Sequence, residues 1–475
     1  MPKLTLINPH PAGRFGEEDI RVIVQMPLNL AYVAAHTPED WEVDLIDETR
    51  ECALDENDQL TFDADLVGIT SLTYQAPRAY AIARAAKKKG IPVVFGGTHA
   101  TTATEEASGI VDAVVVGEAE GVWGRLLSDF AKGELGGVYD GGFPELDYLE
   151  TRPRRDLFQD KYGYKYSSII TTKGCPWKCS FCSVPLAQGR AFRERSVEDV
   201  LAEMEETPFQ GLMFAEDNFY GYKESSNARA RELFRGMVQR GIRKDWFGFT
   251  QFSTGHDTEA LADMSASGCL GFLIGMESTD EQVLKRISKG SNIKTGVENY
   301  PSAIRNIHDN GMIVWASVIW GADFQKAEHF YSMTDYILEH SIDVLTFGVH
   351  TPFPKTALHK RLTQENRIFR TNYPDDWYYY DTAHLTHTLS HMTLDEFIDG
   401  MQYVYDHLYG QDNLKKRFKQ SLAATGEMRT AMFAYKVGSD WDKVFRQVLD
   451  NLHELRESGL YERVMRERGL ELQTA

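Results

Sequence analysis

The first third of the chain alternates short apolar runs with stretches whose apolar residues recur at helical spacing. The apolar runs predict buried strands, and the amphipathic stretches between them predict helices. This alternation is typical of an α/β domain with a doubly wound, Rossmann-like parallel sheet. The predicted strands are residues 4–7, 43–46, 66–70, 93–95 and 113–116, and the predicted helices are residues 28–36, 77–89 and 122–132.

Two glycine pairs, Gly136-Gly137 and Gly141-Gly142, are followed by Pro144 and predict a linker. From about residue 168 a second alternation begins and repeats six times. Six βα units with right-handed crossovers predict a partial (β/α)6 barrel with its site at the carboxyl ends of the strands. The predicted strands are residues 168–171, 212–214, 247–252, 271–276, 313–319 and 344–349, with helices at 197–206, 228–240, 259–267, 281–287, 302–310 and 328–340.

Beyond about residue 361 the strand pattern fades, and helices are predicted at 394–409, 413–421, 440–456 and 461–468. The last two carry mixed charges at a spacing typical of surface helices. An aromatic cluster precedes them, for which packing at a domain junction is favoured over a cavity wall. It consists of Tyr373, Trp377, Tyr378, Tyr379 and Tyr380. The predicted domains are residues 1–140, 165–360 and a mostly helical 361–475, with a linker over 141–164.

Composition and charge narrow the range of partners. The 475 residues are 42% hydrophobic and 25% charged, as in ordinary globular proteins, and carry a formal net charge of −19. Such a surface repels polyanions, so nucleic acid is not expected as a partner. No apolar run approaches the ~20 residues that cross a bilayer, and no signal sequence precedes the first strand. We expect a cytoplasmic protein without an integral membrane segment.

Three cysteines in one short segment carry the most specific chemistry. Cys175, Cys179 and Cys182 have the spacing C-x-x-x-C-x-x-C. Three thiolates from one loop suit three corners of a 4Fe-4S cubane and leave the fourth iron open to a small molecule. A structural zinc site normally needs a second pair of ligands, and the remaining cysteines, Cys52 and Cys269, are isolated. A disulfide framework is equally unexpected, because five cysteines are few and odd in number.

Glycine-rich and hydroxyl-bearing segments follow the predicted strands of the N-terminal sheet. Sheets of this kind bind ligands outside the carboxyl ends of their strands. A glycine pair there lets a large planar ligand approach the backbone, although Gly96 and Gly97 alone also suit a tight turn. The segments are Asn8 to Gly13, Thr70-Ser71-Leu72-Thr73, Gly96-Gly97-Thr98-His99 and Gly117-Glu118.

With these motifs in order, residues 3 to about 360 resemble the cobalamin-dependent radical S-adenosylmethionine enzymes that carry an N-terminal B12-binding domain. The resemblance implies that the open iron binds the amino and carboxylate groups of S-adenosylmethionine, and that reduction yields a 5′-deoxyadenosyl radical. The cysteine triad matches without departure. Phe181, before the last cysteine, matches a family residue near the adenine.

Two acidic segments match the family's S-adenosylmethionine site. Glu216 and Asp217 resemble the acidic motif that receives the methionine ammonium, although the usual form has two aspartates, and the sequence leaves open which of the two makes the contact. Glu277 ends a predicted strand and would hydrogen-bond the ribose hydroxyls or the methionine end. The alternative for Glu277 is an ion pair with Arg286 or Lys289.

For cobalamin, the resemblance places Thr70, Ser71, Leu72, Gly96 and Gly97 around the nucleotide tail, together with His99, Gly117 and Glu118. B12 domains with a protein ligand to cobalt use D-x-H-x-x-G after the first strand, whereas this chain has Asn8-x-His10-x-x-Gly13. Many family members lack this histidine. A loop or capping role for His10 is therefore favoured over a role as axial ligand.

The resemblance implies a methyltransferase in which the radical removes a hydrogen atom from an unactivated carbon and methylcobalamin supplies the methyl group. The expected substrate is a small molecule, namely a natural-product, tetrapyrrole or lipid intermediate, and the expected electron donor is an external flavodoxin or ferredoxin. One alternative is a cyclase or rearrangement enzyme of the same family without methyl transfer. Another is a redox or B12 sensor, which would carry a DNA-binding helix or an interaction tail.

Overall fold

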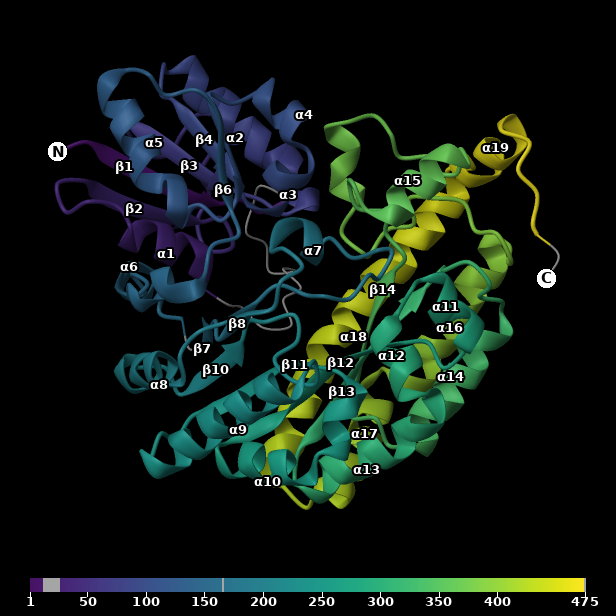
Figure 1. Cartoon of the computed structure of the whole chain (residues 1–475). Helices are drawn as coiled ribbons and strands as arrows, with labels where there is room; N and C mark the ends of the chain where they lie inside the picture. The colour runs from purple at the N-terminus through teal and green to yellow at the C-terminus, as the bar shows by residue number, and fades with distance from the viewer. Residues whose placement is uncertain (12–25, 165, 474–475) are drawn as a thin grey trace.

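The N-terminal domain is an all-parallel, six-stranded sheet, seen in purple and blue in the computed structural model, which describes residues 1–11, 26–164 and 166–473 (Figure 1). The strand order is β2-β1-β3-β4-β5-β6. The strands are β1 (Lys3–Asn8), β2 (Glu42–Asp47), β3 (Leu66–Thr70), β4 (Val93–Gly96), β5 (Ala113–Gly117) and β6 (Gly137–Gly142). The first five confirm the predicted strands, and each of their ends lies within one residue of the predicted end.

Helices cover both faces of this sheet, as the near-continuous apolar strands require. Leu4 and Leu6 pack toward α1 (Leu28–Ala35) and α5 (Glu120–Lys132). Ile7 and Ile69 pack on the other face toward α2 (Ala76–Lys88). The short helices α3 (Gly97–Thr102) and α4 (Thr104–Ser108) follow β4.

Three of the four glycines predicted to form a linker, Gly137, Gly141 and Gly142, instead belong to strand β6 beside β5. A Cβ atom on Gly141 would lie 1.8 Å from the carbonyl oxygen of Glu118, and one on Gly117 would lie 2.5 Å from that of Gly142. Glycine is needed here because two backbones approach closely. The rest of the segment holds one short 3-10 helix (Leu146–Glu150) followed by α6 (Asp156–Tyr162).

The second domain is an open barrel of six parallel strands in the order β14-β13-β12-β11-β10-β7. All six predicted strands are confirmed, the last one to the residue and the other five with shifted ends. They are β7 (Tyr166–Ile169), β10 (Gly211–Phe214), β11 (Asp245–Thr250), β12 (Cys269–Glu277), β13 (Ile313–Trp320) and β14 (Val344–Val349). The outer helices are α8 (Val197–Glu206), α9 (Glu224–Gln239), α10 (Thr258–Ala266), α11 (Glu281–Arg286), α12 (Gly290–Thr295), α13 (Tyr300–Asp309) and α14 (Glu328–Glu339).

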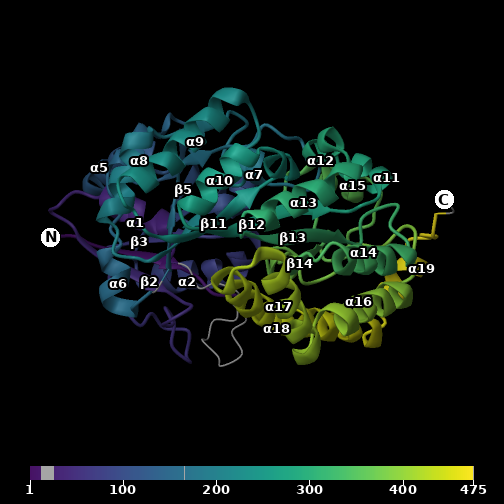
Figure 2. The same cartoon turned by 90° about the horizontal axis from the view of Figure 1, so that it is seen from below.

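The C-terminal helices are α15 (Ala357–Gln364), α16 (Leu394–Leu408), α17 (Gln411–Thr425), α18 (Met428–Glu457) and α19 (Leu460–Glu467). Figure 2 shows α16, α17 and α18 beneath β11 to β14, on the other side of the barrel from α9, α10 and α13. Ala434 and Val437 of α18 pack on Phe247 and Trp315 inside the barrel. The expectation of a surface helix starting at residue 440 is therefore wrong, and the predicted boundary at 360/361 falls inside α15.

The aromatic cluster packs at a domain junction, which confirms the favoured interpretation. Trp377 stacks on Tyr373 with a ring separation of 3.7 Å and donates its indole N–H to Glu106 of the N-terminal domain. Trp377 and Tyr380 belong to the apolar core that covers β3 and α2. Within the described ranges, no helix is both long and apolar enough to cross a membrane.

We expect Phe445→Ala to lower the free energy of unfolding by about 3–5 kcal/mol, because the large side chain leaves a cavity. Phe445 is 0% exposed and its ring lies 4.2 Å from that of Phe347 on β14. The measurement is the thermal midpoint at one fixed scan rate. Met432→Ala is the matched control on the same helix, because Met432 is 50% exposed and its loss should change stability by less than about 0.5 kcal/mol. Equal midpoints for the two variants would contradict the core position of α18.

Candidate functional site

The cysteine loop leaves the barrel between the two strands of a small antiparallel hairpin, β8 (Thr172–Lys173) and β9 (Arg193–Glu194). Gly174 has φ +86°, and a Cβ atom there would lie 2.1 Å from the carbonyl oxygen of Ala191. The Ser180 N–H donates to the Ile287 carbonyl at 2.9 Å, and the Leu358 N–H donates to the Ser180 carbonyl at 2.9 Å. The barrel and α15 therefore hold the loop from both sides.

The three thiols of this loop are half-buried. Desolvation raises the pKa of Cys179 and raises that of Cys182 to about 12. The Tyr222 hydroxyl donates to Cys175 Sγ at 3.2 Å. Among the described residues no three His, Cys, Asp or Glu side chains converge on a single ion. In a cubane each thiolate binds a different iron, and the three free cysteines of this loop supply three such thiolates.

Glu216 and Asp217 follow β10 at the barrel mouth and differ in environment. Glu216 is buried and accepts hydrogen bonds from the N–H groups of Thr171 and Thr172, which lead into the cysteine loop. Burial raises the pKa of Glu216 to about 7. The side chain of Asp217 is exposed, but desolvation by the surrounding residues raises its pKa to about 6, and its charge raises the pKa of Cys182.

Glu277 ends β12 and forms the ion pair that the sequence offered as its alternative. Lys289 Nζ lies 2.6 Å from Glu277 Oε1, and both side chains are nearly buried. Burial alone would lower the pKa of Lys289, but the charges of Glu277 and Cys179 outweigh burial and raise it. This pair lies against the cysteine loop, so Glu277 is close to the place predicted for it.

Phe181 is half-buried in the loop, and its ring meets that of His350 edge-on at 6.0 Å. His350 follows β14 and is buried, which lowers its pKa to about 3. Its Nε2 has no hydrogen-bond partner among the described residues. The sequence analysis did not single out His350, because a lone histidine after an apolar strand carries no motif.

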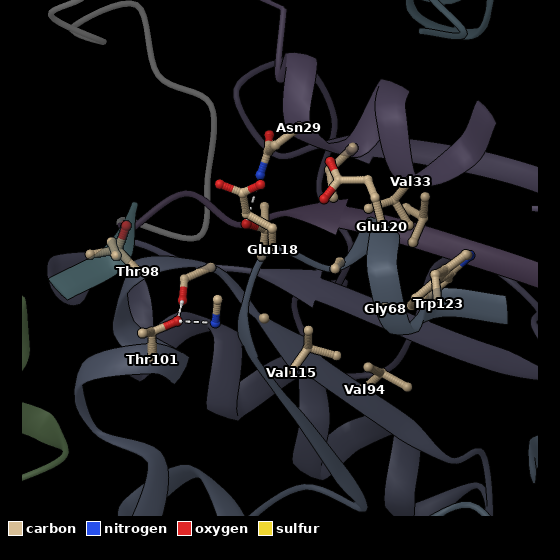
Figure 3. A pocket seen from close by; sticks show the side chains of 18 of the residues that line it. Asn29, Val33, Gly68, Val94, Thr98, Thr101, Val115, Glu118, Glu120 and Trp123 are labelled. Carbon is tan, nitrogen blue, oxygen red and sulfur yellow. Dashed lines mark hydrogen bonds between the residues drawn. The ribbon is translucent and has the colours of Figure 1, made fainter. Parts of the chain in front are cut away.

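A cavity of about 270 Å³ opens at the carboxyl edge of the N-terminal sheet (Figure 3). Its floor is apolar, and includes Leu6, Val94, Val115 and Trp123. Polar groups surround its entrance. Asn29 donates to Thr70 Oγ1 at 2.8 Å, and Thr101 Oγ1 accepts from the Gly117 N–H at 3.1 Å. An apolar slot with polar groups at its entrance suits a planar base attached to a polar chain.

The structure brings five of the predicted tail-site residues to this cavity: Thr70, Gly96, Gly97, Gly117 and Glu118. Gly97 has φ +90°, and a Cβ atom there would lie 2.8 Å from both Ser71 N and Thr70 Oγ1. The glycine is thus also required by the turn. Ser71 and Leu72 lie next to the cavity wall but do not line the cavity. Leu72 is 48% exposed at the same sheet edge.

His99 does not reach the cavity, and its predicted role is therefore wrong. The side chain is 0% exposed, and Nε2 contacts the Tyr80 hydroxyl at 3.1 Å and Glu106 at 3.2 Å. Its ring meets that of Trp377 edge-on at 5.5 Å. His99 instead packs in the junction between the N-terminal and C-terminal parts of the chain.

His10 lies just after β1, outside the residues that line the cavity. Its backbone N–H donates to Glu48 at 3.0 Å, while Asn8 donates to Asp47 at 3.0 Å. Gly13, the end of the motif, lies outside the described residues. The loop or capping role favoured for His10 stays a prediction, and ligation of cobalt stays its alternative.

Residues of the second domain complete the cavity, and sequence reasoning missed them. Lys173, Ala187 and Gln188 line the cavity together with the N-terminal sheet. Arg193 forms a two-pronged ion pair with Glu118, with contacts of 2.6 and 3.1 Å. No local signal marks these contacts, since they join segments far apart in the sequence.

Comparisons with known proteins cover most of the chain. Family models match as B12 binding domain over residues 24–127, Radical SAM superfamily over 169–337 and a domain of unknown function (DUF4070) over 356–455. The chain is 32% identical to bacteriochlorophyllide d C-12(1)-methyltransferase of Chlorobaculum tepidum, covering 76% of this chain and 77% of that protein. It is 24% identical to hopanoid C-2 methylase of Rhodopseudomonas palustris, covering 72% and 65%.

Two solved structures share this architecture. The radical S-adenosylmethionine methyltransferase TsrM from Kitasatospora setae has a TM-score of 0.61 at 19% identity, covering 78% of this chain and 77% of that one. The cobalamin-dependent S-adenosylmethionine radical enzyme OxsB has a TM-score of 0.65 at 14% identity, covering 100% and 82%. At these identities the likeness shows the fold.

The raised pKa of Glu216 predicts a pH-dependent stability. An acid whose folded pKa lies above its unfolded value disfavours the native state as pH rises from about 4.5 to about 7. In cluster-free protein, the stability of the wild type relative to Glu216→Gln should fall by about 3 kcal/mol over that interval. Chemical unfolding at pH 4.5 and pH 8 measures this difference. A difference between the two proteins that does not change with pH would show that Glu216 titrates normally.

Proposed function

Since this chain belongs to the cobalamin-dependent radical S-adenosylmethionine enzymes, we propose that it methylates an unactivated carbon of a tetrapyrrole, lipid or natural-product intermediate through a 5′-deoxyadenosyl radical. Its cofactors are a [4Fe-4S] cluster, S-adenosylmethionine and cobalamin. One observation carries the proposal: the cavity of the N-terminal sheet is lined by residues of the hairpin and loop that hold the cysteines. Both carboxyl edges therefore face one shared space.

When bound, the cluster and S-adenosylmethionine supply the radical that removes a hydrogen atom, and cobalamin supplies the methyl group. Cys175, Cys179 and Cys182 would each hold one iron. Asp217 is the better candidate for the methionine ammonium, because it is accessible whereas Glu216 is bound to the loop backbone. Glu216 would then fix the start of the cysteine loop.

The cobalamin tail would enter the cavity between Thr70, Gly96 and Gly117, with its planar base on the apolar floor. Leu72, exposed at the same edge, would then offer an apolar surface to the corrin ring. Phe181 in the cysteine loop would hold the adenine, and Glu277 at the end of β12 would hold the ribose.

The substrate class rests on the relatives. They are named as methyltransferases of bacteriochlorophyllide d, a tetrapyrrole, and of hopanoids, which are lipids. A one-electron donor of the flavodoxin or ferredoxin type would reduce the cluster. Cyclisation or rearrangement without methyl transfer uses the same cofactors, and the mass of the product separates it from methylation.

The test is anaerobic reconstitution with S-adenosylmethionine and a reductant, followed by mass spectrometry of candidate substrates and cell extracts. We expect 5′-deoxyadenosine and a product heavier by one CH2. Cys179→Ala should lose iron and activity together, while the isolated Cys52→Ala should keep both. Zinc in place of iron in the wild type, or a product of unchanged mass, would overturn methylation by this mechanism.

Asp217→Asn should weaken S-adenosylmethionine binding about tenfold or more, because a charge-assisted hydrogen bond to the ammonium is lost. Equilibrium binding to the reconstituted protein measures the effect. Asp309→Asn is the control, since Asp309 is an exposed aspartate at the end of α13. If Glu216→Gln weakens binding while Asp217→Asn does not, the ammonium belongs to Glu216.

A further inference from the structure

Lys173 joins two sites that lie in different domains. It ends β8, two residues before Cys175, and its side chain lines the cavity of the N-terminal sheet. It is the cation among the described residues that line this cavity, whereas Glu118 and Glu120 are the acids. The side chain of Lys173 is 15% exposed, so it is largely shielded from bulk water.

The ammonium of Lys173 is fixed in place and keeps donors to spare. It donates to the Tyr148 hydroxyl oxygen at 2.6 Å, and Tyr148 in turn donates to Glu118 at 2.5 Å. Burial and the nearby carboxylates raise the pKa of Tyr148, so this hydroxyl stays protonated. Lys173 Nζ also forms an ion pair with Glu118 at 3.7 Å, a distance too long for a hydrogen bond. An ammonium has three donors, and Tyr148 uses one of them.

Arg193 donates hydrogen bonds to both oxygens of Glu118, so the ammonium of Lys173 keeps hydrogen-bond donors for a ligand. Both terminal nitrogens of Arg193 contact the carboxylate, and the same nitrogens donate to the carbonyls of Pro144 and Gln188. Gln188 also lines the cavity. The ion pair therefore connects the wall of the cavity to β9, which pairs with β8 at the other end of the cysteine loop.

We infer that Lys173 is a positioning residue that binds the phosphodiester of the cobalamin tail, and that cobalamin binding thereby orders the cysteine loop. This inference rests on the proposed function. The tail carries one anionic group between its base and the corrin, and a desolvated ammonium at the cavity wall is its natural partner. Because coupling between two sites is reciprocal, cobalamin should slow loss of the cluster, and the cluster should strengthen retention of cobalamin.

The first test measures binding of hydroxocobalamin and of cobinamide, which lacks the nucleotide tail, to cluster-containing protein. Lys173→Met should weaken hydroxocobalamin binding about tenfold or more and leave cobinamide binding unchanged. Lys173→Arg keeps the charge and should restore most of the affinity. Lys178→Met is the control, because Lys178 is an exposed lysine of the same loop.

The second test follows iron release to a chelator, which reports on the loop without catalysis. Hydroxocobalamin should slow release from the wild type severalfold, and neither cobinamide nor inorganic phosphate should do so. In Lys173→Met the protection should disappear. Protection by inorganic phosphate alone would show a general anion site and overturn the assignment to the tail.

The outcomes separate this inference from the proposed function. If Lys173→Met weakens both corrins equally or neither, the inference fails while the enzyme class stands. If the wild type retains neither corrin, the proposed function itself fails.

Discussion

The ion pair between Glu118 and Arg193 is the contact on which the relative placement of the two cofactor sites depends. Both side chains are almost fully buried, with 6% and 5% exposed. Burying two charges is costly unless each finds good partners, and a pair of this kind is strongly destabilising when only one member is removed. Here Arg193 also satisfies two carbonyls, so its position is determined by four contacts rather than one. The hairpin cannot move away from the sheet without leaving a buried charge unpaired.

A second junction holds the other side of the N-terminal domain. Trp377, from the region after the barrel, donates to Glu106, and His99 and Tyr80 contact the same carboxylate. Hydrogen bonds from His99, Trp377 and Tyr80 offset the desolvation of Glu106 and lower its pKa. The N-terminal sheet is thus held by the barrel hairpin at one edge and by the C-terminal region near α2. Such bracketing suits a reaction in which groups on two cofactors must reach one carbon atom.

The sequence predicted what local patterns encode. Apolar runs located β3 and β14 to the residue, and the spacing of three cysteines located the loop and its chemistry. The prediction of a linker at Gly137–Gly142 failed because glycine occurs both in flexible linkers and in strands that pack backbone against backbone. Only the close approach of the Glu118 backbone distinguishes the two cases. The sequence did not predict the first turns of α18, because small residues such as Ala434 give no clear apolar pattern. Their burial depends on packing against Trp315, which is distant in the sequence. His99 shared a turn with true cavity residues, but its side chain points into a core that distant Trp377 completes.

Polar groups at the barrel mouth are unevenly satisfied, and the imbalance indicates where a ligand belongs. Buried polar atoms in native proteins almost always have partners. Glu277 has Lys289, and one oxygen of Glu216 has two backbone N–H groups, but Glu216 Oε2 and His350 Nε2 have none among the described residues. Glu216 follows β10 and His350 follows β14, and β11, β12 and β13 lie between these two strands in the sheet. His350 meets the ring of Phe181, on the side proposed for the adenine, while Glu216 holds the start of the cysteine loop beside Asp217, on the side proposed for the methionine ammonium.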